Sequence, residues 1–171
     1  GGIITPDYEK IKKICDENDI YLIEDCAHAH GCSINGMSAG TLGIAGAFSF
    51  FPTKTLVTGE GGIITTNDDK LYKKASMIRN HGKNPNMENK ISEFGYNYRI
   101  SEITAVIGVQ QMQKAEHIIS ERRKIAGWYG ELLSKVDHVS PLEIPDNIIS
   151  TYYKYIINLS EEYNCAKVKQ R

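Results

Sequence analysis

Short apolar runs alternate with amphipathic stretches along the first half of the chain, which is the pattern of an α/β fold. Three of these runs are predicted to be short buried strands, at residues 20–23, 47–51 and 63–66. The second and third strands flank a loop that contains Lys54, so we expect them to pair like a hairpin. Pro6, capped by Thr5, begins a predicted helix before the first strand, and Asn67 or Asp68 begins another after the third.

The second half of the chain is predicted to be mostly helical, after a polar loop at residues 83–95. Ser101 caps one long helix, and another helix covers residues 116–135. The apolar side chains expected on the inner faces of the helices are Ile11, Ile14, Cys15, Leu71, Ala75, Ile78, Ile118, Ile125, Trp128, Tyr129 and Leu132. A loop as long as residues 83–95 is commonly functional, so we expect it to reach a ligand or a partner.

The pattern changes after the last predicted helix, where Pro141 and Pro145 mark a linker. Beyond them, residues 152–159 alternate weakly and are predicted to form one strand, which is not stable alone. We therefore predict two parts. Residues 1–136 form the C-terminal portion of a large domain with its following long helices, and residues 137–171 form a linker and the truncated start of a small domain.

Composition and charge describe an ordinary globular protein and exclude several functions. The chain is 41% apolar and 24% charged, and 20 Lys+Arg against 21 Asp+Glu give a formal net charge of -1. This balance argues against a nucleic-acid-binding surface. No run approaches the ~18 apolar residues of a membrane span, and the first residues lack the features of a secretory signal. With four cysteines and no CxxC pair, we expect reduced thiols in a cytoplasmic protein.

One cluster of potential metal ligands leaves an alternative open. Cys26, His28, His30 and Cys32 alternate along a short stretch of the chain. On a strand, such alternation places all four side chains on one face, which is an arrangement suited to zinc. We expect no metal here, and metal analysis of the purified protein tests this alternative.

Two segments place chemically useful residues after predicted strands. Asp25 lies at the carboxyl end of the first strand, where ligands bind in open α/β sheets. It either caps the next helix or faces a protonated ring nitrogen of a ligand. Lys54 follows an aromatic, apolar strand, and apolar surroundings favour the neutral, nucleophilic amine. Ser49 and the glycine-rich turn after Lys54 are suited to binding a phosphate, although most lysines in such loops are simply exposed.

A third segment, GYNYR, precedes the helix that Ser101 caps. Asn97 and Arg99 in this segment lie near a helix N-terminus, which is a favourable position for an anion. The simpler interpretation is a turn held in place by its tyrosines.

Together these segments resemble the DegT/DnrJ/EryC1/StrS family of sugar aminotransferases. The matching stretches are EDCAHAHG at residues 24–31, GIAGAFSFFPTKTLVTGEGG at 43–62, RNHG at 79–82 and GYNYR at 95–99. The resemblance implies an α/β fold, part of the large domain of a fold-type I aminotransferase that binds pyridoxal 5′-phosphate (PLP), with helices flanking a mostly parallel sheet.

The resemblance also implies a role for each matching residue. Lys54 matches the lysine that forms the Schiff base with PLP and then moves a proton between the substrate carbon and the cofactor. Asp25 matches the acid that pairs with the pyridinium nitrogen, His28 lies near the ring and its phenolic oxygen, and Ser49 matches a phosphate ligand. Asn97 matches a residue that reaches the phosphate of the neighbouring subunit's cofactor, which implies a homodimer with composite active sites.

The reaction that the resemblance implies transfers an amino group, in this family usually from glutamate, to a keto group of a nucleotide-diphosphate deoxy sugar, for amino-sugar biosynthesis. Relatives that carry histidine at the position of Lys54 are dehydratases, and the lysine argues against that branch. The family's upstream phosphate segment and most of its small C-terminal domain have no counterpart here, so the chain is expected to be a fragment of a longer protein. The alternative function is a non-catalytic PLP-fold fragment that serves in binding or assembly.

Overall fold

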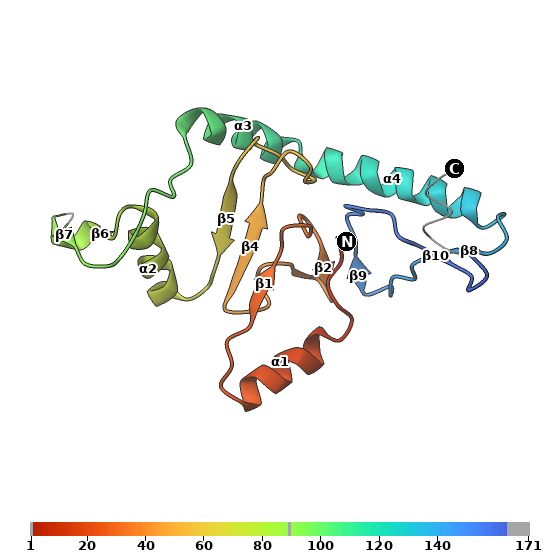
Figure 1. The fold of residues 1–171 in the computed structure, drawn as a ribbon, viewed down its shortest axis with the longest axis horizontal. Coiled ribbons are helices and arrows are strands. Elements are labelled where there is room, and N and C mark those ends of the chain that lie inside the picture. The colour runs from red at the N-terminus through yellow and green to blue at the C-terminus, as the bar shows by residue number, and fades with distance from the viewer. Residues whose placement is uncertain (1, 89, 164–171) are drawn as a thin grey trace.

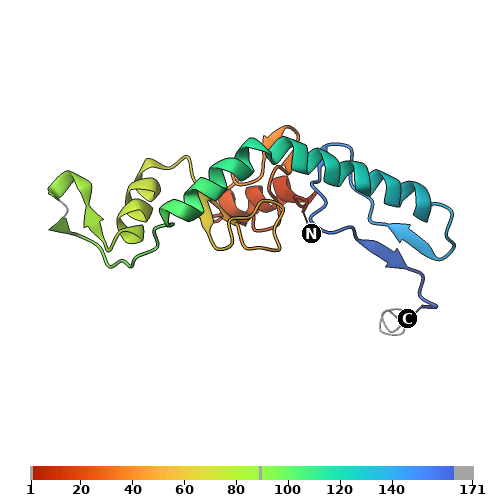
Figure 2. The same ribbon diagram turned by 90° about the horizontal axis from the view of Figure 1, so that it is seen from above.

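A computed structural model describes residues 2–88 and 90–163 of the chain. A small central sheet has α1 (Tyr8–Glu17) below it and α2 (Asp69–Arg79) beside it (Figure 1). Two further helices lie above: α3 (Glu102–Gln113) runs across the top of the sheet, and α4 (Ala115–Leu133) extends beyond it over the C-terminal part of the chain. Viewed from above, α3 and α4 follow one another along the long axis of the molecule (Figure 2).

The central sheet has the strand order β1-β4-β5. Its strands are β1 (Ile23–Asp25), β4 (Ala45–Ser49) and β5 (Gly62–Thr65). The pairing of β1 with β4 is parallel, and that of β4 with β5 is antiparallel, which confirms the predicted hairpin-like pair around Lys54. The sheet is therefore mixed within the described residues. The first strand lies three residues later than predicted, because its pairing with β4 starts only at Ile23, and Tyr21 is 78% exposed.

Three smaller sheets, all antiparallel, complete the described strands. One contains β2 (Ser33–Ile34), β3 (Met37–Ser38) and β9 (Ile148–Ile149). A second joins β6 (Lys83–Asn84) to β7 (Lys90–Ile91) around the 3-10 helix η1 (Pro85–Met87), so the long polar loop contains a small hairpin. The third pairs β8 (Val139–Pro141) with β10 (Ile157–Leu159). The expectation of a lone strand at 152–159 was therefore wrong, since a short strand forms there and has a partner.

Two of the three helices that were predicted to start at a capping residue do start there, and the third does not. Asp68 Oδ1 accepts a hydrogen bond from Leu71 N at 2.8 Å at the start of α2, and Ser101 Oγ accepts one from Thr104 N at 3.2 Å at the start of α3. The first helix, α1, begins at Tyr8 rather than at Pro6, with Asp7 in the capping position.

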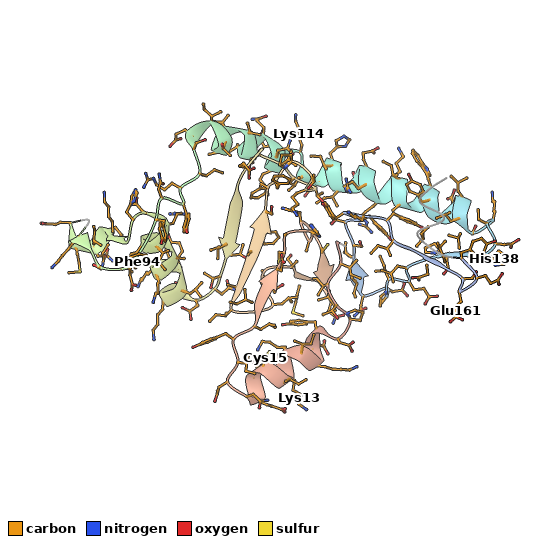
Figure 3. The ribbon with its side chains drawn as sticks, in the orientation of Figure 1. Lys13, Cys15, Phe94, Lys114, His138 and Glu161 are labelled. Carbon is orange, nitrogen blue, oxygen red and sulfur yellow. The ribbon has the colours of Figure 1, made fainter. Side chains whose placement is uncertain are left out.

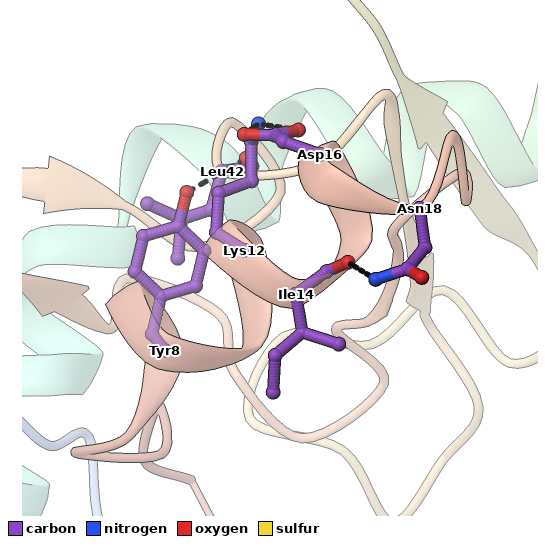
Figure 4. A network of polar contacts seen from close by, with 6 residues as sticks. All are labelled: Tyr8, Lys12, Ile14, Asp16, Asn18 and Leu42. Carbon is purple, nitrogen blue, oxygen red and sulfur yellow. Dashed lines mark hydrogen bonds and ion pairs between the residues drawn. The ribbon is translucent and has the colours of Figure 1, made fainter.

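Contacts at both ends hold α1 in place (Figure 4). The Tyr8 hydroxyl donates to the Leu42 carbonyl at 2.8 Å, which ties the start of the helix to the segment before β4. Asn18 Nδ2 donates to the Ile14 carbonyl at 2.8 Å, just after the helix ends at Glu17. Figure 3 shows Cys15 directed toward the sheet and Lys13 directed away from it.

Several predicted inner faces are not covered in the described structure. Cys15 is buried, and Leu71, Ala75, Ile78 and Ile118 are partly buried, as predicted. The prediction was wrong for the following residues, which are largely exposed: Ile11, Ile14, Ile125, Trp128, Tyr129 and Leu132. On α4, for example, Trp128 and Leu132 are 52% and 63% exposed.

The buried core lies next to the carboxyl end of β1. Its members are Ile4, Cys26, Ala29, Cys32, Ile34, Ala39, Leu42 and Ile148. Ile148 belongs to β9, so residues beyond the predicted boundary at 136 pack against the first part of the chain. Thr151, which is 0% exposed, continues this contact through a hydrogen bond from its N–H to the Gly2 carbonyl at 3.2 Å. The division into residues 1–136 and 137–171 stays a prediction.

The Glu24 carboxylate fixes the segment that enters β4. It accepts hydrogen bonds from the backbone N–H groups of Gly40, Leu42 and Gly43 at 2.8, 2.7 and 2.9 Å. Gly43 cannot be replaced without a shift, because an added Cβ would collide with the Leu22 carbonyl. This charge-assisted clamp sets the position of β4 against β1.

Candidate active site

Asp25 and Ser49 end two neighbouring strands of the central sheet. Asp25 is the last residue of β1 and pairs with Ala47, and Ser49 is the last residue of β4. Because side chains alternate across a strand, Asp25, Ala47 and Ser49 share one face of the sheet. The Asp25 side chain is exposed and that of Ser49 is partly buried, so this face is accessible to a ligand in the described structure.

Lys54 lies in the loop that joins β4 to β5. The loop is held by hydrogen bonds from Lys54 N to the Phe51 carbonyl and from Thr58 N to the Phe50 carbonyl, both at 2.9 Å. Phe50 and Leu56 are buried on either side of the lysine, which is itself partly buried. The Lys54 amine is therefore carried on a turn that the backbone holds in place, and its Nζ lies 5.5 Å from the centroid of the Tyr153 ring.

His28 lies close to both Asp25 and Lys54. Asp25 Oδ1 accepts a hydrogen bond from Ala27 N at 3.0 Å and fixes the turn that places His28. The His28 ring stacks on Tyr153 with centroids 4.0 Å apart and planes 16° apart. Burial lowers the pKa of His28, the positive charge of Lys54 lowers it further, and the negative charge of Asp25 opposes both. Asp25 and Lys54 thus both lie close enough to His28 to influence its protonation.

Asn97 is not brought to this group. It lies on the exposed segment between β7 and α3, on the β5 side of the sheet, whereas Asp25 lies on the β1 edge (Figure 1). Its described contacts are a bridge to Asn80 and a hydrogen bond from Arg99 N to its Oδ1 at 3.3 Å. Arg99 Nη1 in turn donates to Asn80 Oδ1 at 2.5 Å. Phe94 of the same segment projects from the surface (Figure 3).

Two residues near the site were not predicted from the sequence. Tyr153 stacks on His28, and its ring centroid lies 5.5 Å from Lys54 Nζ. His30 is only 4% exposed and lies between the rings of Phe48 and Phe50, at 5.5 and 5.4 Å. The only sequence signals were the aromatic pair around Tyr153 and the second histidine of the EDCAHAHG stretch.

His30 makes the stability of this region depend on pH. Neither ring nitrogen has a hydrogen-bond partner of good geometry among the described residues, although the Ser49 backbone is near enough to favour the protonated ring. Burial, the largest effect, lowers the pKa of His30, so the unfolded chain takes up a proton before the folded one does. The stability that His30 contributes is present above the unfolded pKa of about 6.5 and is lost as the pH falls toward its folded pKa.

We therefore expect the free energy of unfolding to fall as the pH is lowered from about 7.5 to about 5.5, and the slope to be smaller in His30→Leu. Urea titrations at a series of pH values measure this. The exposed His117→Gln serves as the matched control and should retain the wild-type slope. Equal slopes in wild type and His30→Leu would show that His30 does not cause the effect.

The zinc alternative is not supported. Residues 26–32 form turns rather than a strand, so their side chains do not alternate on one face. Within residues 2–88 and 90–163, no three His, Cys, Asp or Glu side chains are grouped so that they could hold a metal ion. Cys32 Sγ donates to the Gly2 carbonyl at 2.9 Å, and burial raises the pKa of Cys26 to about 12, which keeps this thiol protonated.

The fold is shared with solved structures. The aminotransferase TlmJ from Streptoalloteichus hindustanus matches with a TM-score of 0.88 and 30% identity, covering 98% of this chain and 46% of its own. The E. coli GDP-4-keto-6-deoxy-D-mannose-3-dehydratase with bound hydrated PLP matches with a TM-score of 0.86 and 27% identity, covering 99% of this chain and 48% of that one. The fold is therefore that of the PLP-dependent aminotransferases, as the sequence predicted.

Within that class, the chain belongs to the DegT/DnrJ/EryC1/StrS aminotransferase family, which it matches over residues 1–171. GDP-perosamine synthase of Caulobacter vibrioides is 33% identical to it over 156 residues, which are 91% of this chain and 42% of that protein. The chain thus spans less than half the length of the relatives it matches. None of the helices that the structure describes is long and apolar enough to span a membrane.

The described residues fit PLP, the cofactor of this family. Asp25 offers a carboxylate, Ser49 a hydroxyl on the same sheet face, and Lys54 an amine on a fixed turn beside them. A carboxylate suits a protonated ring nitrogen, a hydroxyl suits a phosphate, and an amine suits an aldehyde. The set of donors and acceptors therefore matches the functional groups of the cofactor.

Proposed function

We propose that this chain is part of an enzyme that uses PLP to transfer an amino group to a keto group of a nucleotide-linked deoxy sugar. The observation that carries the proposal is that Lys54, His28 and Asp25 lie together at the ends of β1 and β4, on a chain that matches a sugar aminotransferase family throughout. The name of the Caulobacter relative supports a nucleotide-linked sugar product. The amino donor that we propose is glutamate.

In this mechanism each residue has a defined task. When bound, PLP supplies an electron sink that stabilises negative charge on the substrate carbon. Asp25 would hold a proton at the ring nitrogen, and Ser49 would bind the phosphate. The amine of Lys54 would hold the aldehyde group of the cofactor, and it would also accept and return the proton of the substrate carbon. His28 would orient the ring.

Lysine at position 54 favours amino transfer over dehydration. The E. coli dehydratase shares the fold, so the fold alone does not separate the two reactions. The family resemblance places histidine at this position in dehydratases, and histidine has no primary amine to form a bond with the aldehyde. The amine of Lys54 is present and lies beside His28 and Tyr153.

The reaction is tested with the whole protein, PLP, glutamate and a panel of nucleotide-diphosphate keto sugars. Mass spectrometry is expected to show an amino sugar for at least one member of the panel, and 2-oxoglutarate should form in equal amount. A dehydrated sugar, or no product from any keto sugar, would contradict the proposal. The second candidate, a non-catalytic protein, is disfavoured because Asp25, Ser49 and Lys54 are all present.

We further propose a homodimer in which Asn97 reaches the phosphate site of the partner subunit. Its exposure and its position on the far side of the sheet from Asp25 support a contact made outside its own subunit. We place the enzyme in the cytoplasm, which is consistent with Cys15, Cys26 and Cys32 being free thiols.

Mixing two inactive variants tests the composite site. Lys54→Ala and Asn97→Ala are each expected to be nearly inactive, because each lacks one part of every site. After co-refolding, about half of the dimers are mixed, and each mixed dimer contains one intact site and one doubly defective site. Activity should therefore return to about a quarter of wild type. No recovery in verified mixed dimers would show that Asn97 acts within its own subunit.

A further inference from the structure

Tyr153 reaches the candidate active site from a distant part of the chain. It lies between β9 and β10, on the stretch that runs alongside α4 (Figure 1). Its ring stacks on His28 with centroids 4.0 Å apart, and Lys54 Nζ lies 5.5 Å from the same ring centroid. One aromatic side chain thus touches both the histidine and the lysine of the site.

The backbone around Tyr153 is held rigidly, so this contact is not a chance approach of a surface side chain. Arg122 Nη2, from α4, donates to the carbonyls of both Tyr152 and Tyr153 at 2.8 Å. Tyr152 has a φ of 47°, a left-handed conformation that non-glycine residues seldom adopt. Just before it, Ser150 Oγ donates to the Gly2 carbonyl at 2.7 Å and accepts from Tyr152 N at 3.0 Å.

The strained residue matters because such conformations persist only when the surrounding contacts enforce them. Here a partly buried guanidinium group and a buried hydroxyl, those of Arg122 and Ser150, together fix the chain just where Tyr153 turns toward the site. The direction of the Tyr153 ring is therefore determined by packing on both sides.

We propose that Tyr153 is a positioning residue of the candidate active site. Its ring fixes the orientation of His28, and its face gives the Lys54 amine a defined place whenever that amine is not bonded to the cofactor. A cation over an aromatic face within about 6 Å is attracted by the ring. The role of Tyr153 toward Lys54 rests on the proposed function, whereas its role toward His28 follows from the stacking itself.

The test measures the pKa of His28 in the cofactor-free protein, by NMR titration of its imidazole ring. In wild type, burial lowers the pKa of His28, with Lys54 and Lys154 lowering it and Asp25 raising it. In Tyr153→Ala the ring loses its cover, so the pKa of His28 should rise toward the ordinary histidine value. In Tyr153→Phe the stacking remains and the pKa should stay as in wild type.

Tyr155→Ala is the matched control, because this tyrosine lies on the same segment but packs on Tyr129, at 5.2 Å, and not on His28. It should leave the pKa of His28 unchanged. An unchanged pKa in Tyr153→Ala, or an equal shift in Tyr155→Ala, would overturn the proposal. If circular dichroism shows that Tyr153→Ala is unfolded, Tyr153→Leu takes its place, with the same expected rise.

A second measurement addresses Lys54. In the PLP-loaded whole protein, kcat is expected to fall about tenfold in Tyr153→Ala, with KM for the sugar nearly unchanged and with Tyr153→Phe close to wild type. A loss of activity confined to KM would contradict positioning of the amine. Because the NMR experiment needs neither cofactor nor substrate, failure of the proposed reaction and failure of this inference are separate results.

Discussion

Lys54→Ala is expected to remove the visible absorption band of the PLP-loaded whole protein and to lower kcat by about 10²–10⁴-fold. Both effects have the same cause, since the variant lacks the only group proposed to bind the aldehyde and to carry the proton. The turn that carries Lys54 is fixed by the hydrogen bond from Lys54 N to the Phe51 carbonyl at 2.9 Å. Absorption spectra and steady-state kinetics measure the two losses.

Lys70→Ala is the matched control, because Lys70 is an exposed lysine at the start of α2. It should keep both the band and the activity. A Lys54→Ala protein that retains the visible band after dialysis would show that another amine holds the cofactor. The family assignment would then stand, while the lysine assignment would be wrong.

Asp25→Asn is expected to have the second largest effect, a fall in kcat of about 10²–10³-fold with the fold intact. The amide oxygen still accepts the hydrogen bond that Ala27 N donates at 3.0 Å, so the turn before His28 should persist. What is lost is the negative charge that would keep the ring nitrogen protonated. The comparison with wild type therefore measures the charge rather than the shape of the site.

Kinetics with the best substrate of the panel, together with the absorption spectrum, measure this effect. Asp146→Asn, which changes an exposed aspartate far along the chain, should behave as wild type. If Asp25→Asn keeps the wild-type kcat, the pairing of Asp25 with the ring nitrogen is refuted. A further check is the pKa of His28, which should fall in this variant because Asp25 raises it.

Much of the sheet was predictable because its strands are apolar runs that end in strong turn signals. The glycines between Lys54 and β5 marked the hairpin-like pair, and Asp68 and Ser101 marked helix starts that the structure confirms. The position of β1 was not predictable from the run at residues 20–23, because its register depends on where β4 lies. That position is set by the Glu24 clamp, which is a tertiary contact without a local signal.

The residues of the candidate site were likewise indicated by the sequence only in part. Asp25, Ser49 and Lys54 were singled out because each ends or follows an apolar strand within a recognisable motif. In the structure Asp25 ends β1, Ser49 ends β4 and Lys54 lies on the loop after β4, and the roles of all three stay predictions. Tyr153 was not predicted, because it approaches His28 only through contacts that Arg122 makes across the fold. The exposed face of α4 was missed because periodicity shows which side of a helix is apolar but not what covers it.

The alternation of side chains along β1 limits where this protein tolerates a change of length. If one residue were inserted within β1, Glu24 would take the place of Asp25 beside Ala47, and both the loop clamp and the acid of the site would be lost. The turn between β2 and β3 is exposed, and nothing lies near Gly36 at its tip, although the φ of 78° at Gly36 means that this glycine itself should be kept. A peptide tag or a fluorescent label is therefore best introduced at that tip, where it leaves the ladder between β1 and β4 unaltered.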